Sequence, residues 1–173
     1  MPLNAASLSS LVEAICITQD AIGRQILIEN PSSYFSAPDS TISEAEFITC
    51  VARQSGCGLL VDVNNVYVSA HNLVFDADDY LNALPASLIG EIHLAGHTRE
   101  QAHGDDILLD SHGTPVSEPV WALYARLLAR TGAIPTLIER DNAIPTWRDL
   151  AAEATRADQI AAALHPRQRS VAN

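Results

Sequence analysis

Apolar residues recur along the chain in two spacings, one typical of helices and the other of buried strands. Leu8, Leu11, Val12 and Ile15 follow helical spacing, and that segment stops at Gly23, a residue that often ends helices. Short continuous apolar runs, of the length of buried strands, separate the helical segments. The pattern therefore predicts helices and strands in alternation.

The expected elements alternate along the whole chain. Helices are expected at residues 8–22, 41–55, 76–84, 118–130 and 146–164. Strands are expected at residues 26–30, 58–65, 89–96 and 136–140. Ser43 and Glu46 form a capping box at the start of the second helix, and Pro119 occupies the first turn of the fourth. Continuous apolar strands that alternate with helices indicate an α/β fold with a parallel sheet.

The size of the chain limits the architecture. A closed (β/α)8 TIM barrel usually needs about 250 residues, and this chain has 173. About four parallel βα units are expected over residues 1–164, followed by a frayed tail at 165–173. This pattern alone leaves two possibilities open, a small open sheet or the C-terminal half of a larger barrel.

Composition and charge exclude several classes of partner. The net charge is −11, which argues against nucleic acid and against an anionic membrane surface. No apolar run approaches the roughly 18 residues that a transmembrane helix needs. The start of the chain lacks the basic and apolar regions of a signal peptide. Three cysteines without a disulfide-like pattern favour a reducing compartment, so a cytoplasmic location is expected.

Polar side chains that can bind a metal stand near the end of each expected strand. They are Glu29 on the first strand, Asp62 and Asn64 on the second, Glu91 and His93 on the third, and Glu139 on the fourth. Residues two apart on a strand share a face. The carboxyl ends of parallel strands form one rim, where active sites of α/β folds are built.

The segment after the third strand adds His97, Asp110 and His112. Carboxylates and imidazoles together suit iron, manganese or zinc. Any one of these residues alone is more typical of a surface group or an ion pair. As a set they predict either a metal site or a purely structural polar network, because apolar strands rarely tolerate such residues unless they are paired or metal-bound.

Six motifs occur in a specific order along the chain. They are Ile28-Glu-Asn-Pro-Ser-Ser-Tyr34, Gly56-Cys-Gly-Leu-Leu-Val-Asp-Val-Asn-Asn-Val-Tyr-Val-Ser69, Gly90-Glu-Ile-His-Leu-Ala-Gly-His97, Asp110-Ser-His112, Pro119-Val-Trp-Ala-Leu-Tyr124 and Pro135-Thr-Leu-Ile-Glu-Arg-Asp141. In combination they resemble the family of multinuclear non-haem iron-dependent oxidative enzymes, long catalogued as an uncharacterised protein family, which includes the methanobactin-biosynthesis oxidase. The resemblance covers nearly all of residues 2–158.

The resemblance implies a TIM barrel related to xylose isomerase and endonuclease four. It implies two or three iron ions, the use of dioxygen, and oxidative remodelling of cysteine residues in a ribosomally made peptide that a partner protein delivers. The iron ligands carried over are Glu29, Asp62, Asn64, His93, Asp110, His112 and Glu139. Asn65 is the alternative to Asn64. The expected same-face spacing with Asp62 favours Asn64. Glu91 and His97 are expected to orient the ligands.

This chain departs from the family at its N-terminus. Family members begin with a further segment that forms the first barrel strands and supplies more His ligands. The chain therefore resembles the C-terminal half of the barrel, and we expect weak or substoichiometric iron binding. Its open sheet edges are expected to favour self-association.

Two other functions remain open from the sequence. One is a divalent-metal hydrolase or isomerase of the same barrel superfamily, which iron dependence and oxygen consumption would distinguish. The other is a non-catalytic half-barrel remnant, or a subunit that contributes half a barrel to an assembly.

Overall fold

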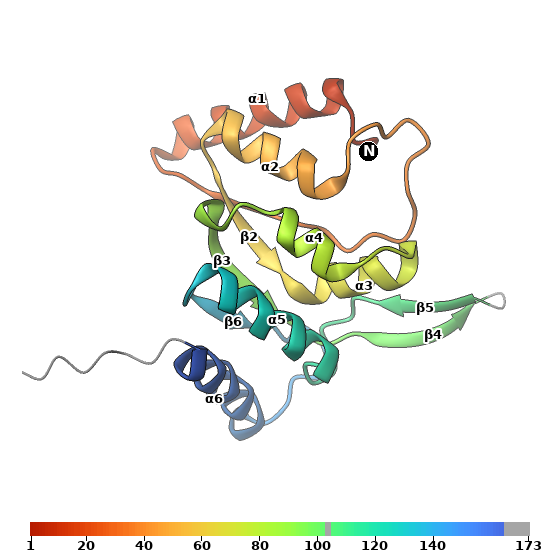
Figure 1. Cartoon of the computed structure of the whole chain (residues 1–173), viewed down its shortest axis with the longest axis vertical. Helices are drawn as coiled ribbons and strands as arrows, with labels where there is room; N and C mark the ends of the chain where they lie inside the picture. Colours follow the sequence, from red (N-terminus) through yellow and green to blue (C-terminus); the bar gives the residue numbers. More distant parts are fainter. Residues whose placement is uncertain (103–104, 165–173) are drawn as a thin grey trace, which may run out of the picture.

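The computed structural model of the protein describes residues 1–102 and 105–164 (Figure 1). The tail expected at residues 165–173 lies outside the described residues. The helices are α1 (Ala5–Ile22), α2 (Glu44–Ser55), α3 (Val63–Leu73), α4 (Ala77–Ala83), η1 (Ala86–Leu88), α5 (Glu118–Thr131) and α6 (Trp147–Leu164). The strands are β1 (Leu27–Glu29), β2 (Gly58–Asp62), β3 (Ile89–Leu94), β4 (Thr98–Ala102), β5 (Asp105–Leu109) and β6 (Thr136–Ile138).

The main sheet has four parallel strands in the order β1-β2-β3-β6. Helices separate these strands along the chain, so the prediction of an α/β fold with a parallel sheet is confirmed. The arrangement corresponds to part of a TIM barrel, and the sheet is open. Asp62 pairs with His93 and His93 with Leu137, so the ends of β2, β3 and β6 lie level with one another.

The helices pack against one face of the sheet. Leu59, Val61, Ile92 and Leu94 are fully buried on that face and belong to the central hydrophobic core. Residues that alternate with them point to the opposite face, where Leu137 is 45% exposed. The apolar core therefore fixes which side chains remain available on the other face and at its rim.

The second strand is shorter than expected. The prediction placed residues 58–65 in one strand, whereas β2 ends at Asp62 and α3 begins at Val63. The Asp62 carboxylate accepts a hydrogen bond from the backbone N–H of Asn65 at 2.8 Å and so caps the new helix. The expectation that Asp62 and Asn64 share a strand face is therefore wrong, because Asn64 lies in the first turn of α3.

A hairpin forms where the sequence indicated only a loop. Strands β4 and β5 pair antiparallel and form a separate two-stranded sheet. Figure 1 shows the hairpin projecting away from the main sheet. It follows β3 directly, so it extends from the rim at which the candidate ligands of β3 lie.

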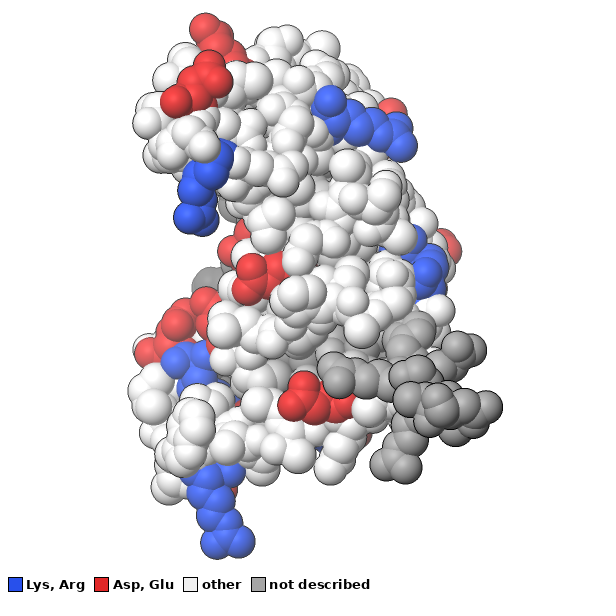
Figure 2. Space-filling view, turned by 90° about the vertical axis from the view of Figure 1, so that its left-hand side faces the viewer, with Lys and Arg blue, Asp and Glu red and all other residues white. Residues whose placement is uncertain are grey.

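Charged side chains are scattered over the face of the molecule drawn in Figure 2. Figure 2 shows small separate groups of acidic and basic residues on a mainly uncharged face, with the basic side chains standing mostly singly. In the described part of the chain, no helix is both long enough and apolar enough to cross a membrane.

Candidate metal centre

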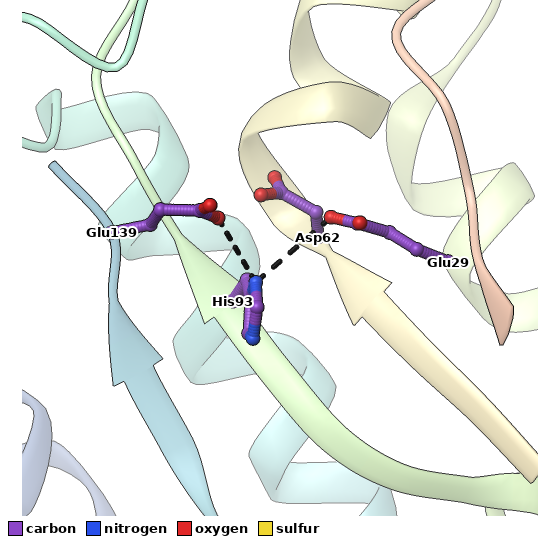
Figure 3. A group of neighbouring side chains, drawn as sticks. All are labelled: Glu29, Asp62, His93 and Glu139. Atoms are coloured by element: carbon purple, nitrogen blue, oxygen red, sulfur yellow. Dashed lines mark hydrogen bonds and ion pairs between the residues drawn. The ribbon is translucent and has the colours of Figure 1, made fainter. Parts of the chain in front are cut away.

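Four side chains from four segments come together at the carboxyl end of the main sheet (Figure 3). Glu29 ends β1, Asp62 ends β2, His93 lies on β3, and Glu139 directly follows β6. One potential ligand atom from each lies within 4.8 Å of those of the other three. Parallel strand pairing explains this convergence, since it brings residues distant in sequence to one rim.

His93 is the centre of this group. Its Nδ1 atom lies 3.0 Å from Oε2 of Glu139 and 3.9 Å from Oε1 of Glu29. Its Nε2 atom lies 3.5 Å from Oε1 of Glu91, which stands two residues earlier on the same strand. Only 13% of the His93 side chain is exposed. The ring is thus enclosed by carboxylates on both of its nitrogen sides.

Asp62 is fully buried, and one of its carboxylate oxygens has no partner. Oδ1 caps α3, but Oδ2 has no hydrogen-bond partner among the described residues. Burial raises the pKa of Asp62 to about 7, because an ionised carboxylate without a compensating cation is costly to bury. A cation at this point would satisfy the free oxygen, so Asp62 fits a metal ligand.

Asn30 supports Asp62 and was absent from the sequence-based candidates. Its side chain accepts a hydrogen bond from the Asp62 N–H at 2.9 Å and donates to the Asp62 carbonyl at 3.0 Å. The Asn65 side chain donates to the Asn30 carbonyl at 3.0 Å. The available signal was an amide residue between a strand and Pro31, which commonly indicates only a turn.

A second group lies next to the first and shares Glu139 with it. The potential ligand atoms of His112, Glu139 and Asp141 all lie within 4.8 Å of one another. Nδ1 of His112 lies 3.2 Å from Oδ2 of Asp141 and 3.7 Å from Oε2 of Glu139. The sequence interpretation did not single out Asp141, although it ends a quoted motif.

The other ring nitrogen of His112 faces Asp110. Nε2 lies 2.7 Å from Oδ1 of Asp110 but forms no hydrogen bond. Burial by itself lowers the pKa of His112, but Asp110, Asp62 and the other nearby carboxylates outweigh this effect and raise the pKa above its usual value. Such a concentration of carboxylates around imidazoles would be stabilised by a cation.

Asn64 connects Asp110 to His97. Its Nδ2 donates to Oδ1 of Asp110 at 2.8 Å, and its Oδ1 lies 2.7 Å from Nδ1 of His97. Burial, followed by the nearby Arg99, lowers the pKa of His97, which favours a neutral ring. Asn64 therefore faces the second group, whereas the Asn65 side chain is directed to Asn30.

Close backbone packing fixes the second group. The N–H of His112 donates to the Gly96 carbonyl at 2.9 Å. A Cβ atom at Gly96 would collide with the carbonyl and side chain of Thr114, so only glycine fits here without a shift. His112 itself has a φ of 48°, an uncommon conformation for a residue with a side chain.

All nine candidate residues lie in this region. The first group consists of Glu29, Asp62, His93 and Glu139. The ligand atoms of His112 lie next to this group because they neighbour Glu139. The contacts given above link the remaining four residues to these, namely Asp110, Asn64, His97 and Glu91. Their roles as metal ligands remain a prediction. Carboxylate oxygens and imidazole nitrogens are a donor set that suits iron, manganese and zinc alike.

Comparison with known proteins identifies the relatives of the chain. The family model described as "RiPP precursor modification enzyme MbnB/TglH/ChrH" matches residues 1–162. RiPPs are ribosomally synthesised and post-translationally modified peptides. A UPF0276 protein of Caulobacter vibrioides is 50% identical over 161 residues, which cover 93% of this chain and 57% of that protein.

Two further relatives are equally similar. A UPF0276 protein of Paraburkholderia phytofirmans is 49% identical over 163 residues, covering 94% of this chain and 53% of that protein. The UPF0276 protein RB0508 of Rhizobium meliloti is 50% identical over 161 residues, covering 92% of this chain and 52% of that protein. The chain thus spans about half the length of these relatives.

Proposed function

Because the chain belongs to the MbnB/TglH/ChrH family of RiPP precursor modification enzymes, we propose that it carries a large part of an iron site that oxidises cysteine residues of a ribosomally made peptide. The observation that supports this most directly is the convergence of Glu29, Asp62, His93 and Glu139, with one buried Asp62 oxygen unpartnered. The complete reaction is proposed for the assembled enzyme, since the chain covers about half of its relatives.

The ligands divide into two sites that share one carboxylate. Glu29, Asp62, His93 and Glu139 would hold one ion, and Asp110, His112, Glu139 and Asn64 would hold a second. Glu139 would contribute to holding both ions, because it belongs to both groups of neighbouring ligand atoms. Asp141 is an additional candidate for the second ion. Glu91 and His97 would orient His93 and Asn64.

Bound iron would supply one-electron redox chemistry with dioxygen, and the remaining tasks fall to the chain. Asp62 and His112 have raised pKa values in the metal-free protein. Ligands must be deprotonated to bind a metal, so metal uptake is expected to release protons from these groups. Glu91 would limit rotation of the His93 ring by its contact with Nε2, so that Nδ1 stays directed at Glu139.

The partners and location follow from the same proposal. The substrate would be a cysteine-containing peptide, brought to the site by a delivery protein. Cys16, Cys50 and Cys57 are all free in the structure. Free thiols suit the reducing cytoplasm, which we propose as the place of action.

Additional strands would complete the barrel. Within the described residues β1 pairs only with β2, and β6 only with β3, so each has one open edge. We propose that strands equivalent to the uncovered part of the relatives occupy these edges, and that the chain self-associates without them.

Metal analysis of anaerobically purified protein tests the proposal. The chain should be measured alone and together with the part of the Caulobacter vibrioides relative that the match leaves uncovered, expressed as a separate chain. We expect substoichiometric iron in the first sample and more in the second, with oxygen consumption in the presence of a cysteine-containing peptide. Light scattering of both samples reports self-association.

Controls separate the alternatives. Asp62→Ala should lower iron content in both samples, whereas Glu13→Gln on the exposed side of α1 should not. Metal-dependent activity without oxygen consumption would instead indicate a hydrolase or isomerase. No metal in either sample would contradict the proposal and favour a non-catalytic remnant.

A further inference from the structure

The outer edge of β5 is closed by side chains of α3. Asn72 donates through Nδ2 to the Leu108 carbonyl at 2.9 Å, and its Oδ1 accepts from the Leu108 N–H at 2.9 Å. His71 Nε2 lies 3.0 Å from the Asp106 carbonyl. These side chains take the place of a neighbouring strand, so β5 offers no free edge at Leu108.

The same contacts show which backbone groups of β4 face outward. In an antiparallel pair, directly opposed residues alternate between those that bond each other and those whose N–H and C=O point away. The backbone N–H and C=O groups of Leu108 point away from β4. Its partner on β4 is Arg99, so the backbone N–H and C=O groups of Arg99 point away from β5, and those of Gln101, two residues further, do the same. The backbone groups of Glu100, which lies between them, bond to Ile107 on β5 instead.

The outer edge of β4 is thus open. No hydrogen-bond partner for the outward backbone groups of Arg99 and Gln101 is found in residues 1–102 and 105–164. Arg99, Glu100 and Gln101 are all exposed. The Arg99 side chain is engaged by Asp106 at 3.4 Å, so the feature that this edge offers is its backbone.

The open edge begins beside the metal centre. Thr98, the first residue of β4, follows His97, whose ring contacts Asn64. The His97 carbonyl accepts a hydrogen bond from Thr114 Oγ1 at 3.0 Å, and the Gly96 carbonyl accepts one from His112. A strand rises about 3.3 Å per residue, so a chain paired with Arg99 would reach His97 within a few residues.

We propose that the outer edge of β4 binds an extended segment of the peptide substrate by strand addition and directs the adjoining residues to the metal centre. The inference rests on the proposed function for the nature of the occupant, since family members modify peptides. Backbone pairing with Arg99 and Gln101 would provide the affinity, and it tolerates many side-chain sequences. The contrast with β5, whose edge α3 closes, explains why β4 is the strand used.

Amide hydrogen exchange measured by NMR tests the inference. The probe is a synthetic peptide of alternating threonine and valine with one central cysteine, blocked at both ends and added at millimolar concentration. The amides of Arg99 and Gln101 should exchange fast in the free protein and slow by about 10-fold when nine-tenths of the protein is occupied. The Glu100 amide, already bonded to β5, should change little.

A pair of variants isolates the backbone group. Gln101→Pro removes the outward N–H but no bond to β5, and proline is tolerated on strand edges. It should weaken probe binding about 5-fold, the order expected for one lost hydrogen bond. Gln101→Ala keeps the N–H and should bind as the unchanged protein does. Both variants should retain the amide spectrum of the hairpin.

The outcomes distinguish this inference from the proposed function. Unchanged exchange at Arg99 and Gln101 at millimolar probe would overturn strand addition at β4, as would equal binding by both variants. Iron content is measured separately, on the chain alone and on the chain together with the added part of the relative. Iron uptake in the second sample without protection of β4 would refute only the docking edge, whereas protection of β4 without iron uptake in either sample would refute only the metal site.

Discussion

Nδ1 of His93 lies 3.0 Å from Oε2 of Glu139, although 46 residues separate the two in sequence. Strand pairing brings them together: His93 is level with Leu137 on β6, and the Glu139 N–H donates to the Leu94 carbonyl at 2.9 Å. The contact is therefore built on the sheet itself, which holds both side chains more rigidly than loops would. Rigid placement of this kind favours a defined metal geometry.

Replacement of His93 should weaken metal binding without unfolding the protein. His93→Ala takes away the one imidazole of the first group, and damage to a ligand shell typically lowers metal affinity by about 10-fold or more. Metal content after dialysis against a defined iron concentration measures the effect. His71→Ala removes an imidazole outside the cluster and serves as the matched control. Equal metal content in both variants would contradict the assignment of His93.

Asp62→Asn should separate stability from metal binding. Asparagine keeps an oxygen that can cap α3, but it removes a buried negative charge that lacks a full set of partners. The metal-free variant is therefore expected to unfold at a higher urea concentration than the unchanged protein near pH 8. Its metal content should fall. A variant that is both less stable and equally metal-loaded would show that Asp62 is a structural residue only.

The sequence predicted the sheet because its information is local and repetitive. The apolar runs around Leu59 and Ile92 identify buried strands wherever they pair, and both residues are fully buried. The alternation of such strands with helices indicates a parallel sheet, whereas the strand order β1-β2-β3-β6 comes from the structure. Convergence of Glu29, His93 and Glu139 at one end of the sheet then needs only the positions of the strand ends.

What the sequence did not predict depends on local competition and distant contacts. Residues 63–65 directly follow the apolar run of β2 and were therefore included in the expected strand, but capping by Asp62 starts a helix there. The hairpin edge depends on Asn72, which reaches β5 from 36 residues away. A single sequence contains no signal for such a contact. Asn30 was missed because an amide residue before Pro31 commonly indicates only a turn, and its contacts with Asp62 depend on a segment 32 residues away.

Gly96→Ala should disturb the second ligand group. The added methyl group would collide with Thr114, so either the segment around Thr114 or the segment that follows β3 must move. Because the Gly96 carbonyl also binds the His112 N–H, the movement would displace His112. We expect a loss of about 1–3 kcal/mol in the free energy of unfolding, typical of overpacking. Metal content should fall as well.

Gly23→Ala provides the matched control for that substitution. Gly23 has a φ of 67°, and a Cβ atom added to it would have no neighbouring atom within 4 Å, so alanine there is strained but meets no obstacle. It lies at the end of α1, away from the ligands. It should lower stability and leave metal content unchanged. Equal metal content in Gly23→Ala and Gly96→Ala would show that Gly96 has no positioning role.

Glu44→Gln should change the pH dependence of stability. Burial raises the pKa of Glu44, although hydrogen bonds from Tyr80 (2.9 Å) and Ser33 (3.2 Å) partly oppose this effect. The folded protein therefore holds the Glu44 proton more tightly than the unfolded chain, whose glutamate pKa is about 4.3. As pH rises from that value through the folded pKa, Glu44 reduces stability. Glutamine can still accept a hydrogen bond from Tyr80, so urea unfolding from pH 4 to 8 should show stability falling less steeply in Glu44→Gln than in the unchanged protein.

Glu13→Gln is the control for this prediction, because it is an exposed substitution with the same change of charge. Its stability should follow that of the unchanged protein over the same pH range. Parallel curves for all three proteins would contradict the prediction.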